Sequence, residues 1–251
     1  MRLSSIASVL LLCLLFVSGR ATAAEPLRAL LVTGGCCHDY ENQIKILQAG
    51  LGKHLDIDWT VEQYDEKRDR KANVYTKPKW AESFDVIIHN ECFGGVTDGE
   101  FVESIVAEHV RSGVPAVVIH CSMHSYRNAP TADAWRGLIG VTSKRHEKAK
   151  RSLKVVAREA EHPILEGFPS PWSTPNGELY IIERSWPNTQ VLASAYSDEE
   201  KADQPVVWTN QYKGVRVFGT TLGHHNETMQ DDVWLNLTAK GIQWATTADA
   251  Q

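Results

Sequence analysis

The sequence predicts an α/β fold in one domain, with a mostly parallel sheet and helices on both faces. Short, continuously apolar runs alternate with segments whose apolar residues recur at helical spacing, as in β-α-β units. The 251 residues contain no internal repeat, low-complexity tract or linker, so one domain accommodates them. With 43% hydrophobic and 23% charged residues, the composition excludes a disordered or collagen-like chain and a polytopic membrane protein.

The first half of the chain supplies most of the predicted parallel sheet. Apolar runs typical of buried strands lie at 27–32, 86–89 and 115–120, and an alternating strand lies at 57–61. Helical spacing covers 42–51 and a segment that starts at Asp98. The polar, proline-containing stretch 65–79 predicts an exposed loop.

The second half is richer in strands. They are predicted at 153–157, 179–182, 191–195, 205–208 and 216–221. A short helix over 134–139 precedes them, and a longer helix over 232–245 closes the domain. We therefore expect an antiparallel edge beside the parallel strands.

Residues 1–23 have the features of a secretory signal peptide. Arg2 supplies the positive charge, 6–17 is a nearly unbroken apolar run, and Ala21-Thr22-Ala23 matches a cleavage site. The apolar run is too short to span a bilayer as a mature helix. The sequence therefore predicts a secreted or periplasmic domain over 27–246, with no membrane span in the mature protein.

The charge balance bears on the kind of partner. The formal net charge is −5, and removal of 1–23 leaves 24 Lys and Arg against 31 Asp and Glu, a charge of −7. Nucleic acid is therefore not expected as the main partner, because phosphate binding needs clustered Lys and Arg. Glycine-rich nucleotide motifs are also missing. We expect a small-molecule substrate, and a homo-oligomer is compatible with the sequence.

Histidines gather where predicted strands end. They are His38, His89, His120, His224 and His225, with His146 in the segment after the short helix. Because the carboxyl ends of parallel strands meet at one edge, several of these imidazoles should share a crevice. Neutral imidazoles there could bind a transition metal, act as acid and base, or do both. Taken singly, each could equally be a hydrogen-bonded histidine at a strand end.

Four cysteines remain in the predicted mature chain: Cys36, Cys37, Cys92 and Cys121. An oxidising compartment permits disulfides, but a bridge between the neighbours Cys36 and Cys37 would be strained. No C-x-x-C pair indicates zinc. We expect small buried thiols near strand ends, with a reactive thiol in a site as the alternative.

Short motifs follow one another along the whole mature chain. They are 31–35 with His38-Asp39-Tyr40, 84–87, Ile119-His120, Trp135 with 138–140, His146, 162–164, 178–180, 205–208, 216–218, 222–224 and 241–245. Their order and spacing resemble the ThuA-like, or trehalose-utilisation, family. That resemblance implies a flavodoxin-like fold similar to class I glutamine amidotransferases.

The resemblance also implies a carbohydrate-linked role, on disaccharides or their 3-keto derivatives. The catalytic candidates are His38, His120, His224 and Glu178, and the substrate-binding candidates are Asp39, Tyr40, Tyr180, Cys121 and His225. The metal-binding candidates are His38, His120, His146 and His224, for a divalent ion such as zinc. In this hypothesis His120 or His38 is the base, and the metal polarises the sugar carbonyl. Cys36-Cys37 and 121–124 depart from the commoner family pattern, which points to a subgroup.

Two other functions stay open. One is a non-catalytic periplasmic sugar-binding module, because fold alone does not fix function. The other is a cysteine-dependent, amidotransferase-like hydrolase with Cys121 as nucleophile and His225-Asn226-Glu227 as its activating pair. Alignment on Pro115, however, puts His120 rather than Cys121 at the nucleophile position. The glycines of a nucleophile elbow are also missing.

Overall fold

The computed structural model describes residues 25–130 and 132–247. The signal peptide predicted at 1–23 lies outside these residues and stays a prediction. In the described part of the chain, no helix is long and apolar enough to cross a membrane.

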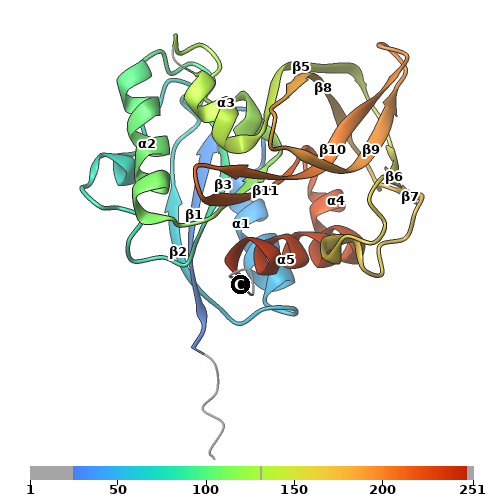
Figure 1. Cartoon of the computed structure of the whole chain (residues 1–251). Coiled ribbons are helices and arrows are strands. Elements are labelled where there is room, and N and C mark those ends of the chain that lie inside the picture. Colours follow the sequence, from blue (N-terminus) through green and yellow to red (C-terminus); the bar gives the residue numbers. More distant parts are fainter. Residues whose placement is uncertain (1–24, 131, 248–251) are drawn as a thin grey trace, which may run out of the picture.

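A mixed sheet forms the centre of the molecule, and among the described residues it has nine strands (Figure 1). Its order is β2-β1-β3-β4-β11-β10-β9-β6-β7. The strands are β1 (Leu27–Gly35), β2 (Ile57–Gln63), β3 (Val86–Cys92), β4 (Ala116–Ile119), β6 (Lys154–Ala157), β7 (Trp172–Ser173), β9 (Gln190–Ser197), β10 (Ala202–Tyr212) and β11 (Val215–Thr220). Strands β2, β1, β3, β4 and β11 are parallel, and the others are antiparallel to their neighbours. The α/β prediction is confirmed, with an antiparallel part wider than the expected edge.

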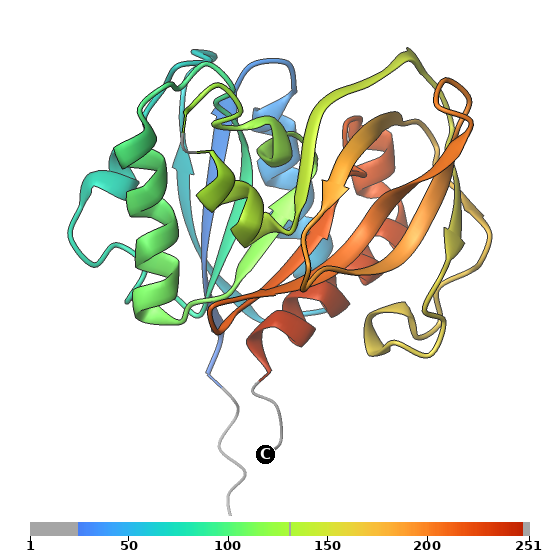
Figure 2. The same cartoon turned by 45° about the horizontal axis from the view of Figure 1, so that its top comes forward.

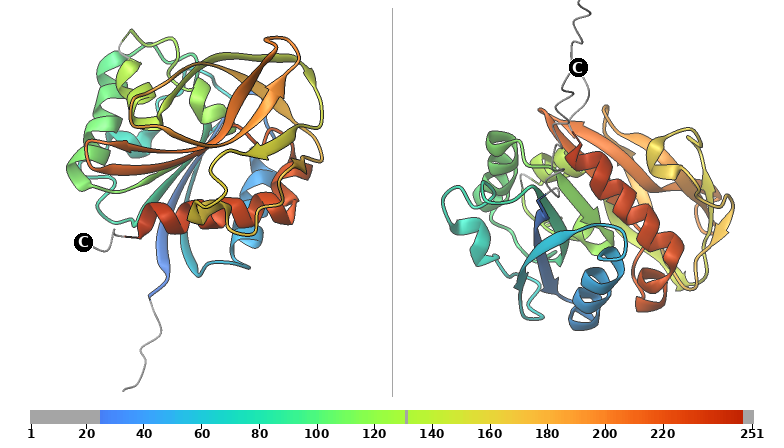
Figure 3. Two further views of the ribbon diagram at one scale, coloured as in Figure 1. Left: turned by 45° about the vertical axis from the view of Figure 1, so that its right-hand side comes forward. Right: turned by 90° about the horizontal axis from the view of Figure 1, so that it is seen from below.

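Helices cover both faces of this sheet (Figure 3). Helices α1 (Tyr40–Leu51) and α5 (Asp232–Thr246) pack on one face with the short α4 (Asn226–Gln230). Helices α2 (Gly99–Ser112) and α3 (Asp133–Ile139) pack on the other. The three long helices each begin at an aspartate whose carboxylate accepts a backbone N–H of the first turn: Asp39, Asp98 and Asp231.

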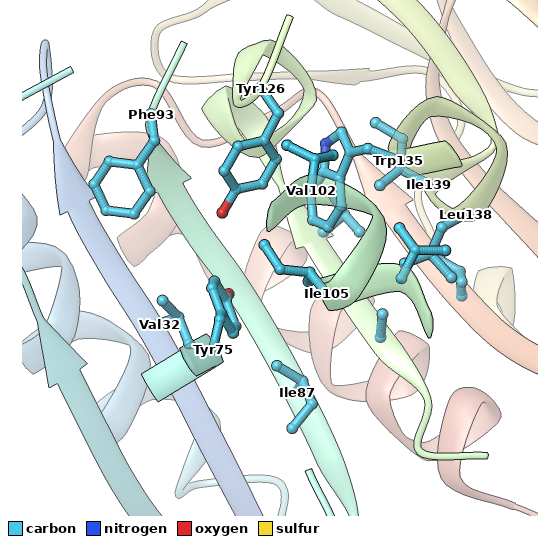
Figure 4. Close-up of a cluster of buried hydrophobic side chains, with 14 of the residues drawn as sticks. Val32, Tyr75, Ile87, Phe93, Val102, Ile105, Tyr126, Trp135, Leu138 and Ile139 are labelled. Carbon is cyan, nitrogen blue, oxygen red and sulfur yellow. The ribbon is translucent and has the colours of Figure 1, made fainter. Parts of the chain in front are cut away.

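Alternate residues of β1 divide between two hydrophobic cores. Leu30 and Val32 lie in the core under α2 and α3, whereas Leu31 lies in the core under α1 and α5. Figure 4 shows the first core, which also contains Tyr75. Tyr75 belongs to the 3₁₀ turn η1 (Asn73–Thr76) and is 3% exposed. The prediction of an exposed loop over 65–79 is therefore wrong at this turn, because its apolar side chains pack into the core.

A second, two-stranded sheet pairs β5 (Val141–Lys150) with β8 (Glu178–Ser185) antiparallel, and in Figure 1 it lies above β9 and β10. Strand β5 was not predicted from the sequence, because its residues are mostly basic and polar. The register places His146 opposite Tyr180 and Lys150 opposite Glu178. Two further 3₁₀ turns, η2 (His120–His124) and η3 (Pro163–Leu165), follow β4 and β6.

Candidate functional site

A pocket of about 480 Å³ lies at the edge where the parallel strands end, the edge that Figure 2 brings toward the viewer. The lining comes from the β1–α1 loop (Cys36, Cys37, His38), the end of β3 and the residues after it (Cys92, Gly94), η2 and the segment after it (Cys121, His124, Arg127), β5 (Lys144, Arg145, His146, Lys150), β8 (Glu178, Tyr180), and Arg68 and His224 from loops. The volume is within the range of small-molecule sites. The expected crevice at the strand ends is therefore present.

His120 is the first residue of η2 and directly follows β4. Its φ is +43°, a left-handed conformation that costs a non-glycine residue about 1–3 kcal/mol. The Nδ1–H of its ring donates to the carbonyl oxygen of Thr221 at 2.6 Å. The side chain is thereby oriented with Nε2 toward the other histidines.

Three imidazoles meet at this point. His224 Nδ1 lies 2.9 Å from His38 Nε2 and 3.2 Å from His120 Nε2. His38 Nδ1 lies 3.3 Å from the carbonyl oxygen of Cys36, which can only accept, so the ring donates through Nδ1. The sequence prediction that strand-end histidines share a crevice is confirmed for these three.

Glu178 is the carboxylate at the centre of the cluster and is 5% exposed. Its Oε2 lies 3.3 Å from His120 Nε2 and 3.4 Å from His224 Nδ1. Its Oε1 lies 3.5 Å from His146 Nδ1 and 3.7 Å from Lys150 Nζ. Burial raises the pKa of Glu178, but its contact with His120 and the proximity of His224 and His146 lower it to about 2.

Burial favours the neutral form of His38 and His224. Burial, together with the charges of His120 and His224, lowers the pKa of His38 to about 2. Burial and the charge of His120 lower the pKa of His224 to about 3, although Glu178 acts in the opposite direction. Neutral imidazole is the form that binds metal ions and accepts protons.

The donor set fits a divalent metal ion. His38, His120 and His224 offer nitrogens within 4.8 Å of one another. Nitrogens about 2.1 Å from a common ion lie about 3.0–3.4 Å apart, which is close to the observed contacts. His38 and His120 also donate their other ring N–H to backbone carbonyls, as metal ligands usually do.

His224 and His146 fit the metal set less directly. Lys150 Nζ lies 2.7 Å from His224 Nε2, so the His224 proton is on Nδ1 and would have to move to Nε2 for metal binding. His146 stands apart from the three, because its Nδ1–H donates to the Glu147 carbonyl oxygen and its side chain is 43% exposed at the pocket rim.

The cysteines differ from the expectation of free thiols. Cys36 and Cys37 form one disulfide, and Cys92 and Cys121 form another. Neighbouring strands β3 and β4 end side by side, which brings the Cα atoms of Cys92 and Cys121 to 5.2 Å. Cys37 has a φ of +86° within the adjacent pair. A disulfide sulfur is not a thiolate, so this geometry opposes Cys121 as a nucleophile.

We expect Cys121→Ser to lower the free energy of unfolding by about 2–4 kcal/mol, since its disulfide closes a loop across 29 positions. Denaturant titration measures this loss. Cys92→Ser is the matched control, because it breaks the same bond and should have the same effect on stability and on any activity. Activity abolished in Cys121→Ser but kept in Cys92→Ser would instead establish a cysteine nucleophile.

Of the remaining predicted residues Tyr180, Tyr40 and Asp39, only Tyr180 lines this pocket. Tyr180 lines the pocket and stacks on His124 with ring centroids 4.1 Å apart. The Tyr40 hydroxyl donates to the Cys36 carbonyl oxygen and lies 3.2 Å from His38 Nδ1. It therefore helps to orient the His38 ring. Asp39 caps α1 and accepts from the side chain of Asn226.

His225 lines a neighbouring hollow together with Glu227, and its buried Nδ1 has no hydrogen-bond partner within the described part of the chain. The polar pocket residues that were not predicted from the sequence are His124 and the basic side chains Arg68, Arg127, Lys144, Arg145 and Lys150. Only the even spacing of 144, 146 and 150 could have indicated a common strand face.

Comparison with known families gives one match over almost the whole described chain. The model of the ThuA family, described as trehalose utilisation, matches residues 28–245. A search among curated proteins finds no significant match.

Solved structures share the fold. A ThuA-like protein from Parabacteroides merdae ATCC 43184 is 20% identical, with a TM-score of 0.70 over 89% of this chain and 91% of that chain. One from Bacteroides uniformis ATCC 8492 is 17% identical, with a TM-score of 0.67 over 90% and 94%. A protein described as a GMP synthase subunit, from Thermoplasma acidophilum, is 12% identical, with a TM-score of 0.51 over 88% and 97%. The fold is thus similar to that of glutamine amidotransferase-like proteins.

Proposed function

The chain belongs to the ThuA, or trehalose-utilisation, family, and from this premise we propose that it is an exported enzyme acting on a carbohydrate. The substrate class is a disaccharide or its 3-keto derivative, and a divalent metal ion assists the histidine cluster. The observation that carries the proposal is the convergence of His38, His120 and His224 on the buried carboxylate of Glu178. A structural core would seldom place two imidazoles and a carboxylate, His38, His224 and Glu178, at the wall of an open pocket with a third imidazole, His120, in contact with them.

The residues of the cluster have different roles in the proposed reaction. A divalent ion bound by the three imidazoles would polarise the carbonyl of the sugar. Glu178 is then the nearest group that can accept a proton from the substrate, through Oε1, which points toward His146 and Lys150. The Lys150 ammonium, 3.7 Å from Oε1, stabilises negative charge that develops on the substrate oxygen. The base role first assigned to His120 or His38 passes to Glu178 when those rings bind metal.

Two features support export. The disulfides Cys36–Cys37 and Cys92–Cys121 would be stable in an oxidising compartment and rare in a reducing one. The sequence pattern of 1–23 matches a signal peptide. A non-catalytic sugar-binding module, in contrast, gives no reason for three imidazoles to gather around one buried carboxylate.

Elemental analysis of the purified protein tests the metal. We expect near-stoichiometric divalent metal in the native chain and its loss in His38→Ala/His224→Ala, because two of three ligands are removed. His54→Ala, an exposed histidine outside the pocket, is the control and should keep the metal. Metal absent from the native chain, or retained in the double variant, contradicts this assignment.

Assays with ordinary and 3-keto disaccharides test the enzyme. We expect turnover of at least one of them by the native protein. Sugar binding without any turnover would support the non-catalytic module in place of the enzyme.

A further inference from the structure

The wall of the pocket is strongly basic, in contrast to the formal net charge of −5 of the whole chain. Five lysines and arginines line it: Arg68, Arg127, Lys144, Arg145 and Lys150. Glu178 is the single carboxylate among the described lining residues. The proposed reaction accounts for Lys150 but not for the other four basic residues.

Ion pairs separate these five residues into two groups. Three are paired: Lys144 with Glu183 at 3.7 Å, Arg145 with Glu199 at 3.6 Å and with Glu200, and Lys150 with Glu178 at 3.7 Å. Within residues 25–130 and 132–247, no carboxylate lies within ion-pair distance of Arg68 or Arg127. These two guanidinium groups therefore bring uncompensated positive charge to the pocket.

Two consecutive glycines after β3, Gly94 and Gly95, lie against the unpaired arginines. A Cβ on Gly94 would lie 3.3 Å from Arg127 Nε, and a Cβ on Gly95 would lie 3.1 Å from the backbone oxygen of Arg68. The Arg127 guanidinium also donates to the carbonyl oxygen of Lys144 at 3.0 Å. The backbone of Arg68 and the side chain of Arg127 thus both pack against this glycine pair, and both residues line the pocket.

Arg127 also lies close to the histidine cluster. The pKa of His124 is lowered to about 3. Burial is the largest cause, and the charge of Arg127 is the next, ahead of His120 and His146. His124 in turn stacks on Tyr180, which contacts His120 with ring centroids 4.5 Å apart. A ligand that reaches Arg127 therefore reaches the reacting centre within one pocket.

We propose that Arg68 and Arg127 form an oxyanion subsite, so that the substrate is a sugar carrying a phosphate or carboxylate group. The planar guanidinium matches both groups, because its parallel N–H bonds fit two oxygens at once. The oxyanion would fix the sugar while its carbonyl faces Glu178 and the three histidines. That the ligand is a sugar rests on the proposed function. That it carries an anionic group rests on the unpaired arginines of the pocket.

Calorimetric titration of the native protein tests the subsite with trehalose, trehalose 6-phosphate, trehalose oxidised to a carboxylate at one C6, and inorganic phosphate. We expect at least one charged sugar to bind tenfold or more tightly than trehalose. Arg127→Gln and Arg68→Gln should each weaken that binding at least tenfold and change trehalose binding less than twofold. The comparison of phosphate with carboxylate identifies the anion.

Arg145→Gln is the matched control, because it removes a pocket arginine that already has carboxylate partners. Arg145→Gln should weaken binding of the charged sugar less than threefold. An equal loss in Arg145→Gln, or no preference for charged sugars in the native protein, overturns the subsite while leaving the proposed function intact. Phosphate bound by the native protein and lost in Arg127→Gln, with no sugar bound, supports the subsite and rejects the sugar substrate.

Discussion

His120→Ala is expected to lower kcat/KM for the carbohydrate substrate by about 10³-fold or more, because the substitution removes both a ligand nitrogen and the partner of Glu178. His120 Nε2 lies 3.3 Å from Glu178 Oε2 and 3.2 Å from His224 Nδ1, so it contacts two other members of the cluster. The backbone turn after β4 places the His120 ring against Glu178 and His224. No neighbouring side chain is expected to take over these contacts. Disaccharide affinity should change little, because the lining from Tyr180 and the basic wall remains.

Steady-state kinetics and calorimetric binding on the same preparation measure the two effects. His54→Ala, outside the pocket, controls for the general loss of an imidazole. A circular-dichroism melt checks the fold, because relief of the left-handed backbone at His120 should offset part of the lost contacts. Equal turnover in His120→Ala and native protein would remove the cluster from the chemistry.

The fold could be predicted from the sequence because its strands have a local signature. The runs that become β1, β3 and β4 are buried on both faces of a parallel sheet, so they read as continuously apolar. Strand β5 carries no such signature, since burial along it is limited to its first residues and Glu147. Its pairing with β8 decides its structure, and such long-range pairing is not encoded in a local pattern.

The histidine cluster could be predicted because topology alone brings strand ends together. His38 follows β1, His120 follows β4 and His224 follows β11, and these strands are parallel in one sheet. The disulfides and the arginine pair could not be predicted in the same way. Whether Cys121 meets Cys92 depends on the distance between two strand ends, and whether Arg127 has a partner depends on side chains far along the chain.

Acidification is expected to destabilise the protein steeply, starting as the pH falls below about 6.5. Burial is the main cause of a lowered pKa in six histidines: His38, to about 2, His109, His124 and His224, each to about 3, and His162 and His225. In the unfolded chain these rings titrate near 6.5, so between about pH 6.5 and 3 the unfolded state binds protons that the folded state does not. Stability is therefore complete above pH 6.5 and is lost as the pH falls. A bound metal ion acts in the same direction, because it needs deprotonated imidazole.

Denaturant titrations at several pH values between 7 and 4 measure the slope of unfolding free energy against pH. Each histidine contributes up to about 1.4 kcal/mol per pH unit, and we expect the slope to correspond to at least two protons. His109→Gln should reduce the slope by about one proton, because His109 is fully buried and its ring N–H donates to Val114. His54→Gln, on the surface, should leave it unchanged. A slope near zero over this range would mean that the buried rings are protonated in the folded protein, which would exclude the neutral imidazoles that the proposed metal site and reaction require.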